Sequence, residues 1–246
     1  MNLKRIPMRP WLLALLLALA PISSAEWNEK VLYSFQGGND GSFPGGGVVF
    51  DQQGNLYGVT EAGGPPSCAP IGSYCGTVYE LSPSIKGGPW TKTLLYMFKG
   101  KRYNDGEVPD GLIIDQAGNL YGVTAYGGTG GCVLVGVPAG CGPTTKGGAW
   151  TEKTLFRFNG QDGATPAAGV VFGKNGNLYG TASAGATRGN GAVFDLAPAG
   201  GGGPWKETVL HLFIDGNDGT SPEGGLVFDA TGSLCGTAGH IKGGAR

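Results

Sequence analysis

Short apolar runs separated by glycine-rich polar segments recur along the chain after residue 25. The runs are rich in β-branched and aromatic side chains, which is typical of β-strands. The first kind of run, called strand a, follows a tryptophan each time and lies at residues 30–35, 93–98, 154–158 and 208–213. The second kind, strand b, lies at residues 47–50, 112–114, 169–172 and 226–228. The pattern predicts β-structure, with no helical period in this part of the chain.

A third run, strand c, carries a five-residue motif that sets the period of the chain. Gly-Asn-Leu-Tyr-Gly stands at residues 54–58, 118–122 and 176–180, and it returns as Gly-Ser-Leu-Cys-Gly at residues 232–236. The fourth position of the motif, at residues 57, 121, 179 and 235, advances by 64, 58 and 56 residues. A nearly fixed period of this length predicts a repeat architecture.

Turn motifs link these runs. Asp-Gly, with a proline three residues after the glycine, lies between strands a and b, and an Asp-x-x-Gly type of turn lies between strands b and c. Asp-Gly supplies a positive φ and a local side-chain hydrogen bond, as a tight reversal requires. A fourth run, strand d, lies at residues 76–81 and 191–196. Aligning Cys75 with Cys141 predicts that the second repeat lacks strand d, and the fourth repeat reaches Arg246 before a strand d begins.

Four short antiparallel strands per repeat predict an all-β, β-propeller-like array of four antiparallel repeats, of which the second and fourth are incomplete. A β-sandwich or another β-repeat array is the alternative. We expect one domain over residues 26–246, with repeats at about 27–89, 90–149, 150–204 and 205–246. Missing strands leave unpaired backbone groups, so self-association through strand edges is a further expectation.

The first 25 residues have the pattern of a secretory signal peptide, with a charged start, an apolar stretch and a small-residue cleavage site after Ala25. The apolar stretch is shorter than the roughly 20 residues of a membrane span, although a retained anchor helix is the alternative. The leader holds three of the 17 Lys and Arg residues, so 14 remain against 18 Asp and Glu. A mildly acidic mature chain argues against nucleic acid and anionic membrane as partners. We therefore expect a secreted or cell-surface protein.

Together, the tryptophan-led strand, Asp-Gly-x-x-Pro, Asp-x-x-Gly-Asn-Leu-Tyr-Gly and Gly-Thr-Val-Tyr-Glu-Leu resemble the Gloeo/Verruco (GloVer) tandem repeat of exported bacterial proteins. The resemblance covers nearly the whole mature chain. It implies extracellular or surface placement and a propeller-like fold, and it brings no reaction and no catalytic residues. Members often end in a sorting or anchoring segment, whereas this chain ends at Arg246 without one. A truncated family member that needs a partner to complete its strands is therefore one hypothesis.

Four cysteines flank the loops between strands c and d of the first two repeats, which predicts two local disulfides, Cys68 with Cys75 and Cys132 with Cys141. Pairing between the repeats and zinc binding are the alternatives. Cys235 takes the tyrosine position of the motif, and we expect it to be a small buried residue rather than a reactive thiol.

Candidate chemistry is sparse. A ring of Asp-Gly carboxylates is a weak calcium candidate, with turn formation as the favoured interpretation, and its members are Asp40, Asp105, Asp162 and Asp218. We expect His211 to pack on its strand, where other repeats have Tyr or Phe, and His240 has no evident orienting partner. No nucleophile elbow, phosphate-binding loop or His-Glu-x-x-His pair occurs. We predict no cofactor, and we favour a non-enzymatic role over catalysis.

Topology predicts a binding face. In a four-strand meander the a–b and c–d connections emerge at one end, and loops held on a rigid scaffold are where binding residues gather. The aromatic and cationic candidates on these loops are Tyr74, Lys101, Arg102, Tyr103, Tyr126 and Arg188. Ordinary solvated loop residues are the alternative interpretation. We expect a glycan or protein ligand, and an exported hydrolase or lyase with a site between repeats, around carboxylates and His240, is the alternative function.

Overall fold

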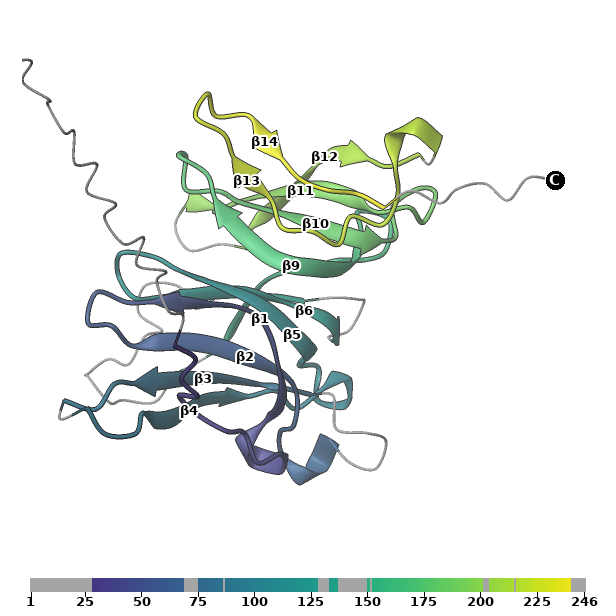
Figure 1. Ribbon diagram of the computed structural model, residues 1–246. Helices are drawn as coiled ribbons and strands as arrows, with labels where there is room; N and C mark the ends of the chain where they lie inside the picture. Colours follow the sequence, from purple (N-terminus) through teal and green to yellow (C-terminus); the bar gives the residue numbers. More distant parts are fainter. Residues whose placement is uncertain are drawn as a thin grey trace, which may run out of the picture. The chain divides into compact units, whose positions relative to one another are not determined.

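Consecutive segments of the chain pair into antiparallel meanders in the computed structural model, which describes residues 28–68, 75–85, 87–127, 133–136, 150, 152–200, 204–214 and 216–239 (Figure 1). The first sheet has the order β1 (Ser42–Phe50), β2 (Leu56–Ala62), β3 (Thr77–Ser82), β4 (Thr91–Met97). The second has β5 (Gly106–Ile114), β6 (Leu120–Gly127), β7 (Val133–Gly136), β8 (Lys153–Arg157). The third has β9 (Ala164–Phe172), β10 (Leu178–Ala184), β11 (Ala192–Ala197), β12 (Lys206–Leu212).

A fourth sheet is two-stranded within the described ranges and pairs β13 (Val227–Phe228) with β14 (Leu234–Cys235). All named pairings are antiparallel, and each four-stranded sheet repeats the same connectivity. The predicted fold class, an all-β propeller-like repeat array, is thereby confirmed. The described part of the chain contains no helix long and apolar enough to cross a membrane, and the predicted signal peptide at residues 1–25 lies outside it.

The sheets are displaced by one strand from the sequence repeats. Each four-stranded sheet contains strands b, c and d of one repeat and strand a of the next, because β4, β8 and β12 pair with the preceding β3, β7 and β11. The prediction that residues 30–35 form a strand is wrong, since residues 28–36 have no strand. Strand a of each later repeat pairs with the strand d before it, and among the described residues no strand d precedes this segment.

The prediction that the second repeat lacks strand d is also wrong. β7 pairs with both β6 and β8 and occupies the place that β3 has in the first sheet. The alignment failed because it placed the gap after Cys141, whereas the strand lies before it, at Val133–Gly136. The predicted disulfide between Cys132 and Cys141 lies outside the described residues, and β7 stands between these two positions.

The signature motif is explained by hydrogen bonds within its turn. The Asp51 carboxylate accepts the N–H groups of Gln53 and Asn55, the Asn55 side-chain amide and the Tyr57 hydroxyl. Asp115 makes the same set of bonds in the second repeat. Gly54 adopts a φ of +83° in this turn, a conformation that favours glycine. Asp, Gly, Asn and Tyr therefore form one structural unit that leads the chain into strand c.

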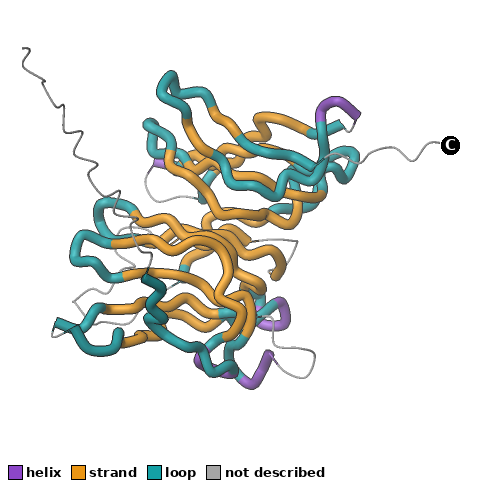
Figure 2. Tube along the Cα trace, in the orientation of Figure 1, coloured by secondary structure: helices purple, strands orange, loops and turns teal. Residues whose placement is uncertain are grey.

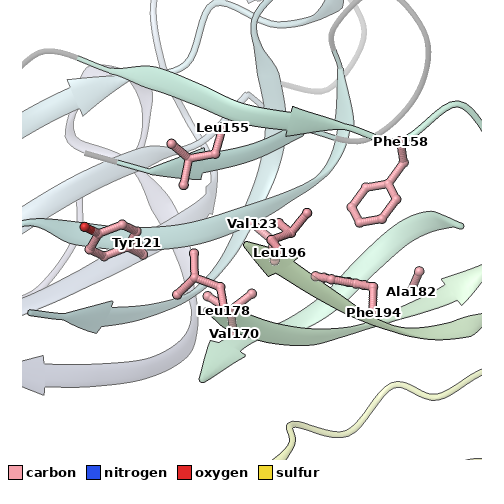
Figure 3. Close-up of a cluster of buried hydrophobic side chains, with 9 residues drawn as sticks. All are labelled: Tyr121, Val123, Leu155, Phe158, Val170, Leu178, Ala182, Phe194 and Leu196. Carbon is pink, nitrogen blue, oxygen red and sulfur yellow. The ribbon is translucent and has the colours of Figure 1, made fainter. Parts of the chain in front are cut away.

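The largest buried cluster joins the second and third sheets (Figure 3). On β11 the buried residues Ala192, Phe194 and Leu196 alternate with partly exposed neighbours, as expected for a strand with one face in a core. Figure 3 shows Phe158, which follows β8, beside Phe194, and the two rings lie edge to face with centroids 4.9 Å apart. Strand a of a repeat thus also packs against strand d of that repeat, across sheets.

Glycines let neighbouring sheets approach at their first strands. Gly111 lies at a bulge in β5 with a φ of +54°, and a Cβ added there would lie 2.6 Å from the Cα of Gly169 on β9. Gly46 on β1 is similar, since an added Cβ would lie 2.7 Å from the Gly111 amide nitrogen. Real Cβ atoms do not come this close, so these contacts require glycine.

Candidate binding face

In the first and third repeats, the described parts of the a–b and c–d connections lie together at one end of the sheets, as the topology predicted. The Gly64 N–H donates to the Gly38 carbonyl at 3.0 Å, and the Ala186 N–H donates to the Gly160 carbonyl at 2.9 Å, which ties the two kinds of loop together. The short helical turns η1 (Gly38–Asp40), η2 (Pro66–Cys68), η3 (Lys101–Tyr103) and η5 (Gly216–Asp218) all belong to these loops (Figure 2). We call this end the loop face.

The four Asp-Gly aspartates serve their own loops. The Asp40 carboxylate accepts the Gln36 N–H and the Tyr33 hydroxyl. In the second repeat the Asp105 carboxylate accepts the equivalent hydrogen bonds, from the Lys99 N–H and the Tyr96 hydroxyl. The other two accept backbone N–H groups as well, Asp162 from Asn159 and Asp218 from Ile214. These bonds support turn formation, and no group of three or more His, Cys, Asp or Glu that could hold a metal ion occurs among the described residues.

His211 takes the place of the tyrosines in the fourth repeat. Its Nε2 lies 3.0 Å from an Asp218 carboxylate oxygen, and its ring packs edge to face on Phe213 at 4.8 Å. The equivalent pair Tyr96 and Phe98 has the same arrangement at 5.1 Å. His211 is therefore a strand residue that braces the Asp-Gly turn. His240 lies outside the described residues.

A disulfide between Cys68 and Cys75 closes the first c–d loop, as predicted. Cys75 is buried against Phe98, and a Cβ added at Gly100 would lie 2.9 Å from the Cys75 sulfur. The disulfide therefore supports the base of the loop that carries η3. The expectation for Cys235 is wrong, because its free thiol is exposed on the two-stranded fourth sheet, which leaves that position uncovered.

The exposed candidates of the second repeat gather around η3. Lys101, Arg102 and Tyr103 are exposed, with Tyr103 at 51%, and Tyr126 near the end of β6 is exposed at 53%. β6 contacts η3, and Tyr126 stands opposite Glu107 in the strand register. The Glu107 carboxylate accepts the Lys101 N–H at 2.6 Å. Two cations and Tyr103 thus project from a loop whose backbone is held in place, and Tyr126 projects from the adjoining end of β6. We call these four residues the η3 cluster.

The other candidates are not joined to this cluster. Arg188 is exposed on the c–d loop of the third sheet, and Tyr74 lies outside the described residues. The sequence analysis missed two residues that position the cluster, Glu107 and Asn104. Asn104 accepts a hydrogen bond from the Arg157 guanidinium at 3.0 Å. Their only sequence signal was their closeness to the Asp-Gly turn.

A buried lysine fixes the segment before β1. The Lys92 side chain on β4 is 6% exposed, and its ammonium lies 2.7 Å from the carboxylate of Asp40, whose side chain is 22% exposed. Its ammonium also lies 5.6, 5.0 and 5.9 Å from the ring centroids of Tyr33, Phe35 and Tyr79. Burial alone raises the pKa of Asp40, but hydrogen bonds from Lys92, Gln36 and Tyr33 outweigh it and hold that pKa below its usual value.

Glutamates replace this lysine in the next two sheets. Glu152 precedes β8, and burial, with the nearby charge of Asp105, raises its pKa. Burial raises the pKa of Glu207 on β12 to about 7, with contributions from Asp162 and Asp195. Glu207 Oε1 is buried and has no hydrogen-bond partner among the described residues. The second and third sheets thus have a carboxyl group where the first has a cation.

A groove of about 440 Å³ lies between the third and fourth sheets, with Thr181, Phe213, Asp218, Leu226 and Thr237 among its lining residues. An apolar cavity of about 40 Å³ lies between the first and second sheets, beside Trp150 and Leu120. The groove opens beside the Asp-Gly turn of the fourth repeat. It is the larger concave feature, and it lies on different sheets from the η3 cluster.

Residues 21–246 match the family described as the Gloeobacter/Verrucomicrobia repeat. The chain belongs to this family. No curated protein matches this Gloeobacter/Verrucomicrobia repeat protein in a sequence comparison. Its structure is similar to a gluconolactonase from Xanthomonas campestris, with a TM-score of 0.48 and 16% identity over 78% of this chain and 55% of the other. It is also similar to virginiamycin B lyase from Staphylococcus aureus, with a TM-score of 0.45 and 13% identity over 81% and 50%. The chain spans about half the length of these solved structures.

Proposed function

We propose that this Gloeobacter/Verrucomicrobia repeat protein is an exported, non-enzymatic binding module that recognises an extracellular glycan through the η3 cluster. The observation that carries the proposal is the pair Tyr103 and Tyr126, each about half exposed, on two connected elements. Tyrosine rings stack on the apolar faces of sugars, and their hydroxyls bond to sugar hydroxyls. A protein ligand is the competing outcome of the test below.

Rigidity of the supporting loop favours binding. Glu107 and Asp105 accept backbone N–H groups of the loop, and the disulfide packs against its base. A binding surface that is already ordered loses less conformational entropy when the ligand arrives. The disulfide also agrees with export, because such bonds persist in oxidising compartments.

The experiment is a glycan array with the mature chain, residues 26–246, followed by titration calorimetry on the glycans that bind. Tyr103→Ala and Tyr126→Ala should each weaken binding about tenfold, because a stacking contact is worth roughly 1–1.5 kcal/mol. Tyr126→Phe should keep most of the affinity, since the ring remains. Binding that is unchanged in both alanine variants would refute the site, and binding of peptides alone would change the ligand class.

One observation supports a second candidate, an exported hydrolase or lyase. Asp218 lines the 440 Å³ groove and lies 3.0 Å from His211, so an acid-base pair stands at its edge. If the groove is an active site, Asp218→Asn and His211→Phe should each abolish turnover of a pool of candidate substrates. Identical substrate depletion by the wild type and both variants would exclude the groove as an active site.

A further inference from the structure

The η3 cluster lies in a concentration of positive charge. Lys99, Lys101 and Arg102 lie within the four positions 99–102, and all three are exposed. Arg157 approaches from β8, where its guanidinium bonds to Asn104 at the end of the same loop. This local excess contrasts with a chain that has 18 acidic residues against 17 Lys and Arg in total.

Two nearby carboxylates, Asp105 and Glu107, are engaged with the loop backbone. A third, Glu152, lies close enough to Lys99 and Arg157 to interact with their charges. Asp105 is buried and accepts the N–H groups of Lys99 and Gly106, together with the Tyr96 hydroxyl. Glu107 accepts the Lys101 N–H. Among the described residues, no carboxylate lies within 4.0 Å of the Lys101 ammonium or the Arg102 guanidinium. The acidic groups therefore shape the loop, and the cationic ends of Lys101 and Arg102 face solvent.

We propose that the glycan bound at the η3 cluster is a polyanion built from uronic acid units. A uronate ring presents an apolar face to a tyrosine and a carboxylate at its edge, and the η3 cluster offers both complements within one loop and one adjoining strand end. Arginine suits this role because its planar guanidinium pairs with both oxygens of a carboxylate. The inference rests on the proposed glycan-binding function and specifies its ligand class.

The decisive probes are a galacturonic acid hexasaccharide and its fully methyl-esterified form, which lacks the carboxylate charges and carries one added methyl group per unit. We expect the acid to bind at least about tenfold more tightly than the ester by calorimetry. The double variant K101Q/R102Q should bind the acid about tenfold more weakly than the wild type, because each exposed charge pair contributes roughly threefold to the affinity. Its affinity for the ester should change little. Raising sodium chloride from 50 to 500 mM should weaken binding of the acid, because salt screens exposed charges.

The matched control is K174Q/K206Q, which removes two exposed lysines at the opposite end of the sheets. It should bind the acid as the wild type does, and thermal melts should show that both double variants stay folded. A carrageenan oligosaccharide, which carries sulfate groups and no carboxylate, distinguishes carboxylate from sulfate recognition, and tighter binding of this sulfated chain would overturn the uronate assignment.

Two negative results separate the proposals. If acid and ester bind equally and only Tyr103→Ala and Tyr126→Ala weaken them, glycan binding stands and the polyanion inference falls. If no oligosaccharide binds the wild type in either form or on the array, both fall.

Discussion

Replacing Lys92 by methionine tests how the segment before β1 is held on the first sheet. Methionine keeps most of the aliphatic length, but it removes the ammonium that contacts Asp40 and three aromatic rings. The free energy of unfolding should therefore fall, because Asp40 keeps its charge and loses its cationic partner.

The magnitude follows from burial. Removing one partner of a fully buried ion pair costs about 3–5 kcal/mol. Asp40 is 22% exposed and keeps the hydrogen bonds from Tyr33 and Gln36, so water and these donors offset part of the loss. We expect K92M to cost about 2 kcal/mol. The control is K153M on β8, an exposed lysine, which should stay within about 0.5 kcal/mol of the wild type.

The assay is urea unfolding, followed by fluorescence, with D40N and the double variant completing a double-mutant cycle. Because the pKa of Asp40 is below 3.8 in the folded protein, the pair stabilises fully above that pH. The difference between the wild type and K92M should shrink as the pH falls through the folded pKa. A K92M cost no greater than that of K153M, or coupling below about 0.5 kcal/mol, would refute this account.

Three further predictions concern other sites. Gly111→Ala should lower the free energy of unfolding, measured in urea, by at least about 3 kcal/mol, since it adds a steric overlap to a left-handed backbone. Gly118→Ala, which changes a left-handed backbone alone, should lower it by about 1 kcal/mol. Equal costs would contradict the close contact between sheets. Because the folded pKa of Glu207 is raised to about 7 from 4.5, wild-type stability should fall as the pH rises between these values. Glu207→Gln should remove that fall and gain about 1–2 kcal/mol at pH 8 after allowance for solvent screening, and an unchanged pH profile would contradict the raised pKa. Reducing the disulfide between Cys68 and Cys75 should cost about 2–3 kcal/mol, measured by melts with and without reductant, and no shift would mean that the loop is ordered without it.

Local turn chemistry made much of the fold predictable from sequence. The Asp-x-x-Gly-Asn-Leu-Tyr-Gly motif marked the turn before strand c in the first two repeats, because Asp51 and Asp115 bond to residues only two to six positions away. Close variants of the motif, with Gly173 in place of the aspartate and with Gly-Ser-Leu-Cys-Gly at residues 232–236, marked it in the other two. The family and the propeller-like class followed from the same motif. Pairing between repeats was harder to predict, since nothing local says whether strand a joins its own repeat or the preceding one.

The candidate site was predictable only as a face. The topology placed Tyr126 and residues 101–103 at one end of the sheets, and the structure brings them together. The roles of Glu107 and Lys92 depend on contacts across strands and sheets, with Lys92 reaching a carboxylate 52 residues away. Such contacts leave no periodic trace in the sequence, so the sequence analysis named neither residue.

The displacement between sheets and repeats determines where the chain tolerates a break. A cut in the loop between β4 and β5 leaves the first sheet with all four strands, whereas a cut between β3 and β4 transfers its last strand to the other fragment. Two co-expressed halves divided at the first point should associate through the apolar contacts between the first and second sheets, with no exchange of strands. Halves divided at the second point should assemble by strand exchange, each incomplete without the other.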